Sequence, residues 1–98
     1  MGQRKIVIKQ SVAESIARIA WYIESQGMVV TAERFSDAVY DFFIKIADDK
    51  RSFSVCRDSM RALMGYKCVN YKRNYTVVLI ESEKEITICE FISSKLIK

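Results

Sequence analysis

Residues 66–92 constrain the fold most, because they have the pattern of three successive strands joined by short polar turns. Tyrosines and β-branched residues, which suit a pleated and half-buried surface, fill most of these positions. Two polar breaks, residues 72–74 and 82–85, have the length and composition of hairpin connections. The sequence therefore predicts an antiparallel meander. Its central strand, residues 75–80, is apolar at nearly every position and should be covered on both faces.

An amphipathic helix is predicted after residue 10. Its apolar residues recur at helical spacing and form one stripe, which consists of Val12, Ile16, Ile19 and Ile23. Ser11 and Glu14 match a capping box, in which the serine accepts from a helix amide and the glutamate reaches back to the cap amide. Gly27 should end the helix, because glycine adopts the left-handed conformation without steric cost.

A second helix is predicted from about Thr31 to residues 48–49, with an apolar stripe at the same spacing: Phe35, Val39, Phe42 and Ile46. Two helices joined by so short a connection should lie antiparallel and cover one face of the sheet. The aromatic residues of the hairpin are expected in the core: Trp21, Phe35, Phe42 and Phe43.

Two further segments complete the predicted organisation. Residues 4–9 read as a short strand that must join the sheet, at an edge that the sequence leaves open. Residues 57–64 form either an ordered loop or one to two helical turns. In the helical version Arg57 and Arg61 face outward, and the inward side chains are Met60, Leu63 and Met64. The fold class is α+β in the order β-α-α-β-β-β, within one domain over residues 1–98.

The composition argues against metal and cofactor chemistry. The chain has three cysteines without the spacing of a zinc site and no histidine, so we expect no metal site and no cofactor. Cys56, Cys68 and Cys89 are predicted to be reduced thiols. No apolar run is long enough for a membrane span or a signal-peptide core, which favours a cytoplasmic location without a membrane partner. Paired carboxylates could be formed by four glutamates, Glu81, Glu83, Glu85 and Glu90, but three of them surround the last turn, so a solvated hairpin end is expected there.

Positive charge is concentrated in the middle of the chain. Residues 50–73 contain seven basic residues and one acid, Asp58, whereas the whole chain carries a net charge of +4. Such an excess attracts polyanions or acidic partners, although basic loops and strand edges also serve solubility. The sequence leaves both interpretations open.

The order of strand, helix hairpin, basic connector and meander resembles the ParE/RelE superfamily of toxins from type II toxin–antitoxin systems. The most specific residues are Gly65-Tyr66-Lys67, the tyrosine-led segment 75–79 and the apolar segment 86–92. The resemblance extends from Lys5 to Lys95. It implies a RelE/ParE-like fold and an antitoxin partner that wraps the hairpin and the sheet.

The resemblance also implies a target. ParE-like members act on DNA gyrase by binding it, whereas RelE-like members cut messenger RNA on the ribosome. The absence of histidine, and of any tyrosine after Tyr75, favours the ParE-like, non-enzymatic activity. A ribonuclease would use Arg51, Arg57, Arg61 and Lys67. The basic surface expected to bind the target comprises Arg57, Arg61, Lys67, Lys72, Arg73 and Lys95.

A third hypothesis is a toxin homologue that has lost activity and serves as an antitoxin-binding module. Ser93 and Ser94 stand where many members of the superfamily have histidine and arginine, and Lys67 stands in place of an arginine. The assembly, whether a homodimer or a toxin–antitoxin hetero-oligomer, is left open by the sequence.

Overall fold

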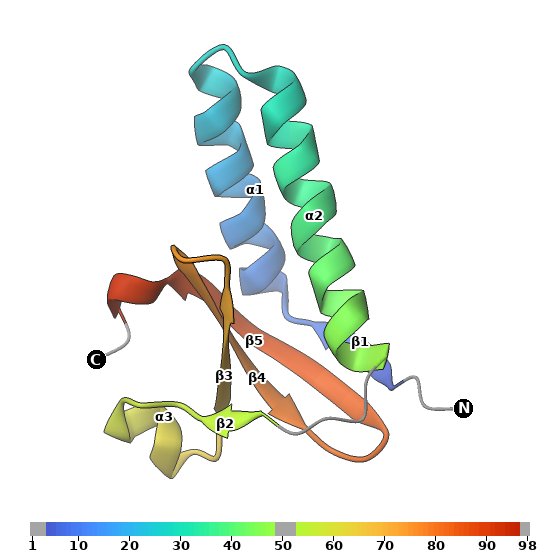
Figure 1. The fold of residues 1–98 in the computed structure, drawn as a ribbon, viewed down its shortest axis with the longest axis vertical. Coiled ribbons are helices and arrows are strands. Elements are labelled where there is room, and N and C mark those ends of the chain that lie inside the picture. The colour runs from blue at the N-terminus through green and yellow to red at the C-terminus, as the bar shows by residue number, and fades with distance from the viewer. Residues whose placement is uncertain (1–3, 49–52, 97–98) are drawn as a thin grey trace.

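A computed structural model describes residues 4–48 and 53–96 (Figure 1). It confirms the α+β class and the predicted order of the main elements, and it adds a short strand, β2, before the meander. The elements are β1 (Lys5–Ile8), α1 (Gln10–Ser25), α2 (Val29–Asp48), β2 (Ser54–Val55), α3 (Ser59–Leu63), β3 (Lys67–Tyr71), β4 (Tyr75–Glu81), β5 (Glu85–Ser93) and the 3-10 turn η1 (Ser94–Leu96).

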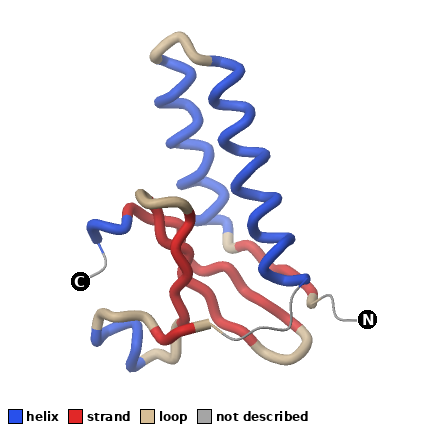
Figure 2. Tube along the Cα trace, in the orientation of Figure 1, coloured by secondary structure: helices blue, strands red, loops and turns tan. Residues whose placement is uncertain are grey.

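The strands form one five-stranded sheet in the order β1-β5-β4-β3-β2. The predicted meander is confirmed: β3, β4 and β5 pair antiparallel through short turns, which Figure 2 shows as loops. β4 lies in the centre, and its residues 76–79 are buried on both faces, as predicted. The prediction is wrong for Ile80, whose side chain is 41% exposed. β1 pairs parallel to β5, with Ile6 opposite Ile86, which settles the edge that the first strand takes.

The α1–α2 hairpin packs on one face of the sheet, and the main core lies between the two layers (Figure 1). α1 contributes Val12 and Ile16 to this core, while β4 contributes Val77 and Leu79. Phe91 of β5 is the centre of an aromatic cluster. Its ring stacks on Tyr75 at 4.9 Å and contacts three further rings, those of Tyr71, Phe35 and Phe43.

The predicted helix starts are wrong by one or two residues. α1 begins at Gln10 with Lys9 as its N-cap, and no side chain caps it, so the proposed capping box of Ser11 and Glu14 is not formed. The parallel pairing with β5 explains this start: the Lys9 N–H donates to the Ile88 carbonyl, so the chain passes directly from strand to helix. The second helix begins at Val29, before Thr31.

The predicted end of α1 is confirmed. Gly27 has φ +84°, and its N–H donates to the Glu24 carbonyl at 2.9 Å. The prediction for Trp21 is wrong, since its side chain is 68% exposed. Trp21 is two residues from both Ile19 and Ile23, which places it on the side of α1 opposite the buried stripe. The other three aromatic residues that were predicted in the core pack in or against it: Phe35, Phe42 and Phe43.

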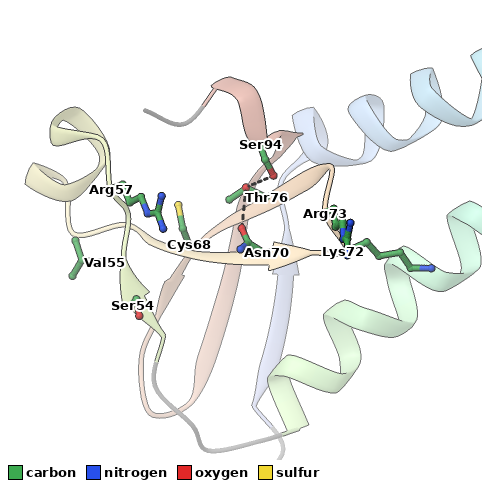
Figure 3. A pocket seen from close by; sticks show the side chains of 9 residues that line it. All are labelled: Ser54, Val55, Arg57, Cys68, Asn70, Lys72, Arg73, Thr76 and Ser94. Carbon is green, nitrogen blue, oxygen red and sulfur yellow. Dashed lines mark hydrogen bonds between the residues drawn. The ribbon is translucent and has the colours of Figure 1, made fainter.

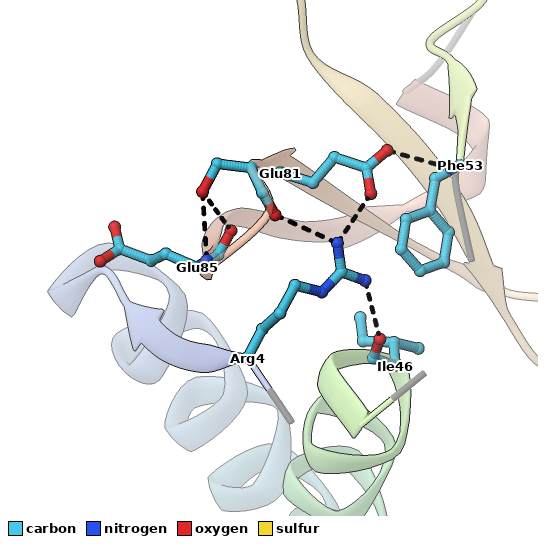
Figure 4. A network of polar contacts seen from close by, with 6 residues as sticks. Arg4, Ile46, Phe53, Glu81 and Glu85 are labelled. Carbon is cyan, nitrogen blue, oxygen red and sulfur yellow. Dashed lines mark hydrogen bonds and ion pairs between the residues drawn. The ribbon is translucent and has the colours of Figure 1, made fainter. Parts of the chain in front are cut away.

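A buried ion pair joins three elements at the end of the sheet (Figure 4). Arg4 donates through Nη1 to Glu81 Oε2 at 3.2 Å and through Nη2 to the Ile46 carbonyl at 3.5 Å. Glu81 Oε1 also accepts from the Phe53 N–H at 3.2 Å. The prediction that Glu81 is solvated is therefore wrong, because only 14% of its side chain is exposed. No helix within residues 4–48 and 53–96 is long and apolar enough to cross a membrane.

Candidate functional site

The second face of the sheet is not covered by the hairpin. Alternate residues of β3 and β4 point to it, among them Cys68, Thr76 and Val78, because successive side chains of a strand project to opposite faces. We call it the open face. Residues 53–65, here called the strap, pass around the edge of β3 onto this face. Phe53 packs in the main core, whereas Cys56 packs with Val78 in a smaller cluster on the open face.

A disulfide between Cys56 and Cys68 fastens the strap to β3. The prediction of three reduced thiols is therefore wrong for this pair and correct for Cys89, which is free and buried. The Cys56 N–H also donates to the Tyr66 carbonyl at 3.1 Å, and Ser54 pairs with Cys68 in the sheet. The short strand β2 thus brings together two cysteines whose spacing in the sequence gave no sign of pairing.

Arg61 provides a second attachment for the strap. Its Nε and Nη2 donate to the two carboxylate oxygens of Glu90 at 2.9 and 2.7 Å, and its Nη1 donates to Asp58 Oδ2 at 3.3 Å. The hydrogen bonds to Glu90 are the largest cause of a raised pKa for the Arg61 guanidinium. Glu90 is consequently held in an ion pair. Asp58 also caps α3 by accepting from the Arg61 N–H.

Of the two alternatives left open for residues 57–64, the structure has the helical one, α3, but the side-chain orientation expected for that helix is wrong. Met60, Leu63 and Met64 are 71%, 85% and 63% exposed, instead of facing inward. The bidentate Arg61–Glu90 pair explains this orientation, because it turns the polar side of α3 toward the sheet. The apolar side of the helix is thereby directed to solvent.

An open pocket of about 670 Å³ lies between the strap, the β3–β4 hairpin and the turn after β5 (Figure 3). No carboxylate is among the nine described residues that line it. These residues are Ser54, Val55, Arg57, Cys68, Asn70, Lys72, Arg73, Thr76 and Ser94. The lining is polar and cationic, and we call this site the cationic pocket.

A hydroxyl and amide chain forms one wall of the pocket. Thr76 Oγ1 shares a hydrogen bond with Ser94 Oγ at 2.9 Å, in which either hydroxyl can donate, and lies 3.5 Å from Asn70 Oδ1 (Figure 3). The Ser94 N–H donates to the Asn74 carbonyl at 2.9 Å, which fixes the C-terminal turn against the β3–β4 turn. These contacts hold three small polar side chains side by side next to the β3–β4 turn.

The β3–β4 turn places two basic residues at the pocket. Lys72 has φ +55°, a left-handed conformation that tightens the turn before Arg73. The Lys72 side chain extends toward α2 in Figure 3, and its Nζ lies 5.7 Å from the centre of the Tyr71 ring. Arg57 comes from the strap and Arg73 from the turn, so the two arginines line the pocket from opposite sides.

The structure brings together only part of the predicted basic surface. Arg57, Lys72 and Arg73 line the pocket, whereas Arg61 is held by Glu90. Lys67 pairs with Leu79 on the strand side that faces the hairpin. Lys95 lies exposed in η1 and is not among the described lining residues. Arg51 lies outside the described residues.

Sequence reasoning missed the uncharged residues of the pocket, namely Ser54, Asn70, Thr76 and Ser94. One usable signal was present. Asn70 and Cys68 alternate with Val69 and Tyr71 in β3, so the polar face of that strand could be read from its pattern.

The chemistry available in the pocket is that of anion binding. Guanidinium groups make strong hydrogen bonds to carboxylates and phosphates, and the hydroxyl and amide groups add neutral contacts. The chain contains no histidine, and the described lining contains neither a carboxylate nor a phenol that could act as a general base. Within the described residues, no cluster of potential ligands could hold a metal ion.

The fold and the site together define a small α+β protein with a helix hairpin on one sheet face and a cationic pocket on the other. No protein-family model matches the chain, and no curated protein has significant sequence similarity to it.

Proposed function

We propose that the chain is the toxin of a type II toxin–antitoxin pair, of the ParE-like kind, which acts by binding a bacterial target through the cationic pocket. DNA gyrase is the leading target, and an antitoxin is the regulatory partner. The proposal places the protein in the cytoplasm. The sequence support is the order of the elements and the residues quoted above from 65–92.

The observation that carries the proposal is the composition of the pocket. Arg57 and Arg73 can bind an anionic group from two sides, while the described lining offers no carboxylate, phenol or imidazole to take a proton from a substrate. A site with these groups is suited to hold an acidic or phosphorylated surface. It is less suited to cleave a phosphodiester, which requires proton transfer at two oxygens.

The first experiment is pulse-labelling of DNA and protein synthesis in bacteria shortly after the chain is induced without a partner. An early fall in DNA synthesis is expected for a gyrase inhibitor. Purified protein should then inhibit gyrase supercoiling, and the variant with both Arg57→Ala and Arg73→Ala should lose this inhibition. Arg18→Ala, which removes an exposed arginine of α1, is the matched control and should retain it. Absence of inhibition at concentrations well above that of gyrase would exclude the gyrase target.

The second candidate function is a ribosome-dependent endoribonuclease, and the cations of the pocket favour it because cleavage of RNA needs stabilisation of a negative phosphorane. Of the arginine and lysine residues expected for that activity, the pocket contains Arg57. Early loss of protein synthesis, with new transcript ends in translated messages, would establish this function. Continued growth with the chain present in folded form would favour the inactive homologue.

A further inference from the structure

The strap has little burial of its own. Of its residues, Phe53 and Cys56 are buried, and α3 contributes none. The apolar residues that usually anchor a helix are directed to solvent in α3 instead. The strap therefore depends on a small number of discrete attachments, and a segment with so few apolar contacts opens easily once these are lost.

Two attachments act on the part of the strap that enters the open face. One is the Arg61–Glu90 ion pair, whose side chains are 23% and 31% exposed. The other is the Cys56–Cys68 disulfide, supported by one hydrogen bond from Cys56 to Tyr66. β2 adds only two paired residues. Apart from the main chain, which continues from the strap into β3, the disulfide is thus the one covalent link between the described part of the strap and the sheet.

The disulfide also adjoins the cationic pocket. Cys68 lines the pocket, and its sulfur lies beside the Arg57 side chain in Figure 3. Cys56 is 4% exposed and packs against Val78 and Cys89. A soluble thiolate therefore reaches the Cys68 sulfur through the pocket, and the neighbouring Arg57 guanidinium attracts its negative charge.

We propose that the Cys56–Cys68 disulfide is a redox switch that assembles the cationic pocket when oxidised and releases the strap when a dithiol reductant reduces it. A thiolate of the reductant attacks Cys68 Sγ and displaces the Cys56 thiolate, which takes up a proton. The second thiol of the reductant then attacks the mixed disulfide and releases Cys68. Two electrons and two protons pass to the protein, and the reductant becomes a disulfide.

Reduction removes one side of the pocket and leaves the covered face intact. Ser54, Val55 and Arg57 come from the strap, so their positions relative to Arg73 depend on the link. The hairpin and the main core contain no part of the link, since Cys56 and Cys68 pack with the open-face cluster. The effect of the switch on target binding rests on the proposed function, whereas the release of the strap does not.

Cys89 is the one described cysteine outside the Cys56–Cys68 disulfide, and its burial disfavours its participation in thiol–disulfide exchange. Its side chain is buried, and this burial raises the pKa of the thiol, which lowers the fraction of reactive thiolate. The expected exchange therefore involves Cys56 and Cys68 and leaves Cys89 as a thiol.

The test compares the full chain in its oxidised form with the same chain in dithiothreitol. Peptide mapping after alkylation should show Cys56 and Cys68 protected before reduction and alkylated after it. Hydrogen exchange should become faster in peptides of the strap, by roughly a hundredfold for a closed loop of this size. Peptides of α1 and α2 should exchange at an unchanged rate. Equal exchange of the strap in both forms, or a different cysteine pairing, would overturn the proposal.

A double variant, Cys56→Ser with Cys68→Ser, provides the second measurement. It should show the fast strap exchange of the reduced protein and no response to dithiothreitol, while its hairpin stays protected. Should the variant fail to fold, reduction of the natural chain remains decisive, because it needs no substitution. A variant that keeps slow strap exchange would contradict the proposed link.

The gyrase assay separates this inference from the proposed function. Inhibition of supercoiling should weaken on reduction of the natural chain and should no longer depend on reductant in the double variant. If the strap responds to dithiothreitol but the oxidised chain does not inhibit gyrase, the switch stands and the gyrase-directed function is rejected. Growth arrest by a chain whose strap does not respond would reject the switch alone.

Discussion

The two faces of the sheet are stabilised in different ways. The covered face is a continuous apolar layer in which Val77, Leu79, Ile86 and Ile88 are fully buried beneath the hairpin. The open face has a small cluster around Val78, with a strap held by a disulfide and an ion pair. The first type of contact is spread over many atoms, whereas the second is concentrated in a few bonds.

The strand β4 contributes residues to both faces of the sheet. Val77 and Leu79 enter the main core, while Thr76, between Tyr75 and Val77, turns to the cationic pocket. The alternation of the strand directs core residues to one face and pocket residues to the other. Substitutions on the covered face should therefore change the free energy of unfolding, whereas substitutions in the pocket should change binding.

The largest effect is expected for Phe91→Ala on the covered face. Phe91 is 2% exposed and contacts four aromatic rings, so its removal leaves a cavity and should lower the free energy of unfolding by about 3–5 kcal/mol. Urea denaturation followed by circular dichroism measures this loss. Ile92→Ala, at the neighbouring position and half-buried on the open face, is the matched control and should cost clearly less. Equal losses at the two positions would refute the comparison of the faces.

A smaller effect is expected when the ion pair of the strap is broken. Glu90→Gln keeps the size of the side chain but removes the charge that Arg61 contacts at 2.7 Å, and should cost roughly 1–2 kcal/mol. Denaturation at low and high salt checks this, because screening should reduce the difference. Glu83→Gln in the exposed β4–β5 turn is the control, with an expected change within about 0.5 kcal/mol. A loss that salt leaves unchanged would show that packing, rather than charge, holds Glu90.

The same contrast explains what the sequence could predict. The covered face follows from periodic patterns, because the stripe from Val12 to Ile23 and the apolar run of β4 each bury residues at regular spacing. The prediction that Trp21 lies in the core of this face was nevertheless wrong, since aromatic character does not reveal which side of a helix meets the core.

The strap could not be predicted in the same way, because long-range contacts determine it. Arg61 and Glu90 are 29 residues apart, and their pairing reverses the orientation that the apolar residues of α3 favour. The link between Cys56 and Cys68 depends on the two-residue strand β2, which has no pattern of its own. The basic residues of the pocket were recognised from charge, but their division between the two faces required the register of β3.

The pH dependence of stability offers a second test of the covered face. Burial raises the pKa of Tyr71 above its ordinary value of 10.0. Above pH 10 the unfolded chain therefore loses the phenol proton while the folded chain retains it, and the free energy of unfolding falls until the pH passes the folded pKa. The fall reaches up to about 1.4 kcal/mol per pH unit for one such group.

Unfolding measurements at about pH 9 and about pH 11 on the natural chain and on Tyr71→Phe check this prediction. Cys89, whose pKa burial also raises, contributes in the same direction to both proteins. The Tyr71→Phe variant should therefore lose less stability between the two pH values than the natural chain does. Some loss should remain in the variant because Cys89 still contributes. Identical losses in the two proteins would show that the Tyr71 phenol is not shielded from water in the folded state.

The smallest effect is expected for Leu63→Ser on the strap. Leucine is normally a core residue, but Leu63 is 85% exposed, so the polar replacement should change the free energy of unfolding by no more than about 0.5 kcal/mol. The corresponding change at Leu79, which is fully buried on the covered face, gives the contrasting large loss. Denaturation of both variants at two protein concentrations is the measurement. A loss at Leu63 above about 1 kcal/mol would show that α3 packs its apolar side against something in solution. If that loss depended on concentration, the covering surface would be a second copy of the chain, and the open face would then be stabilised by association as well as by its few bonds.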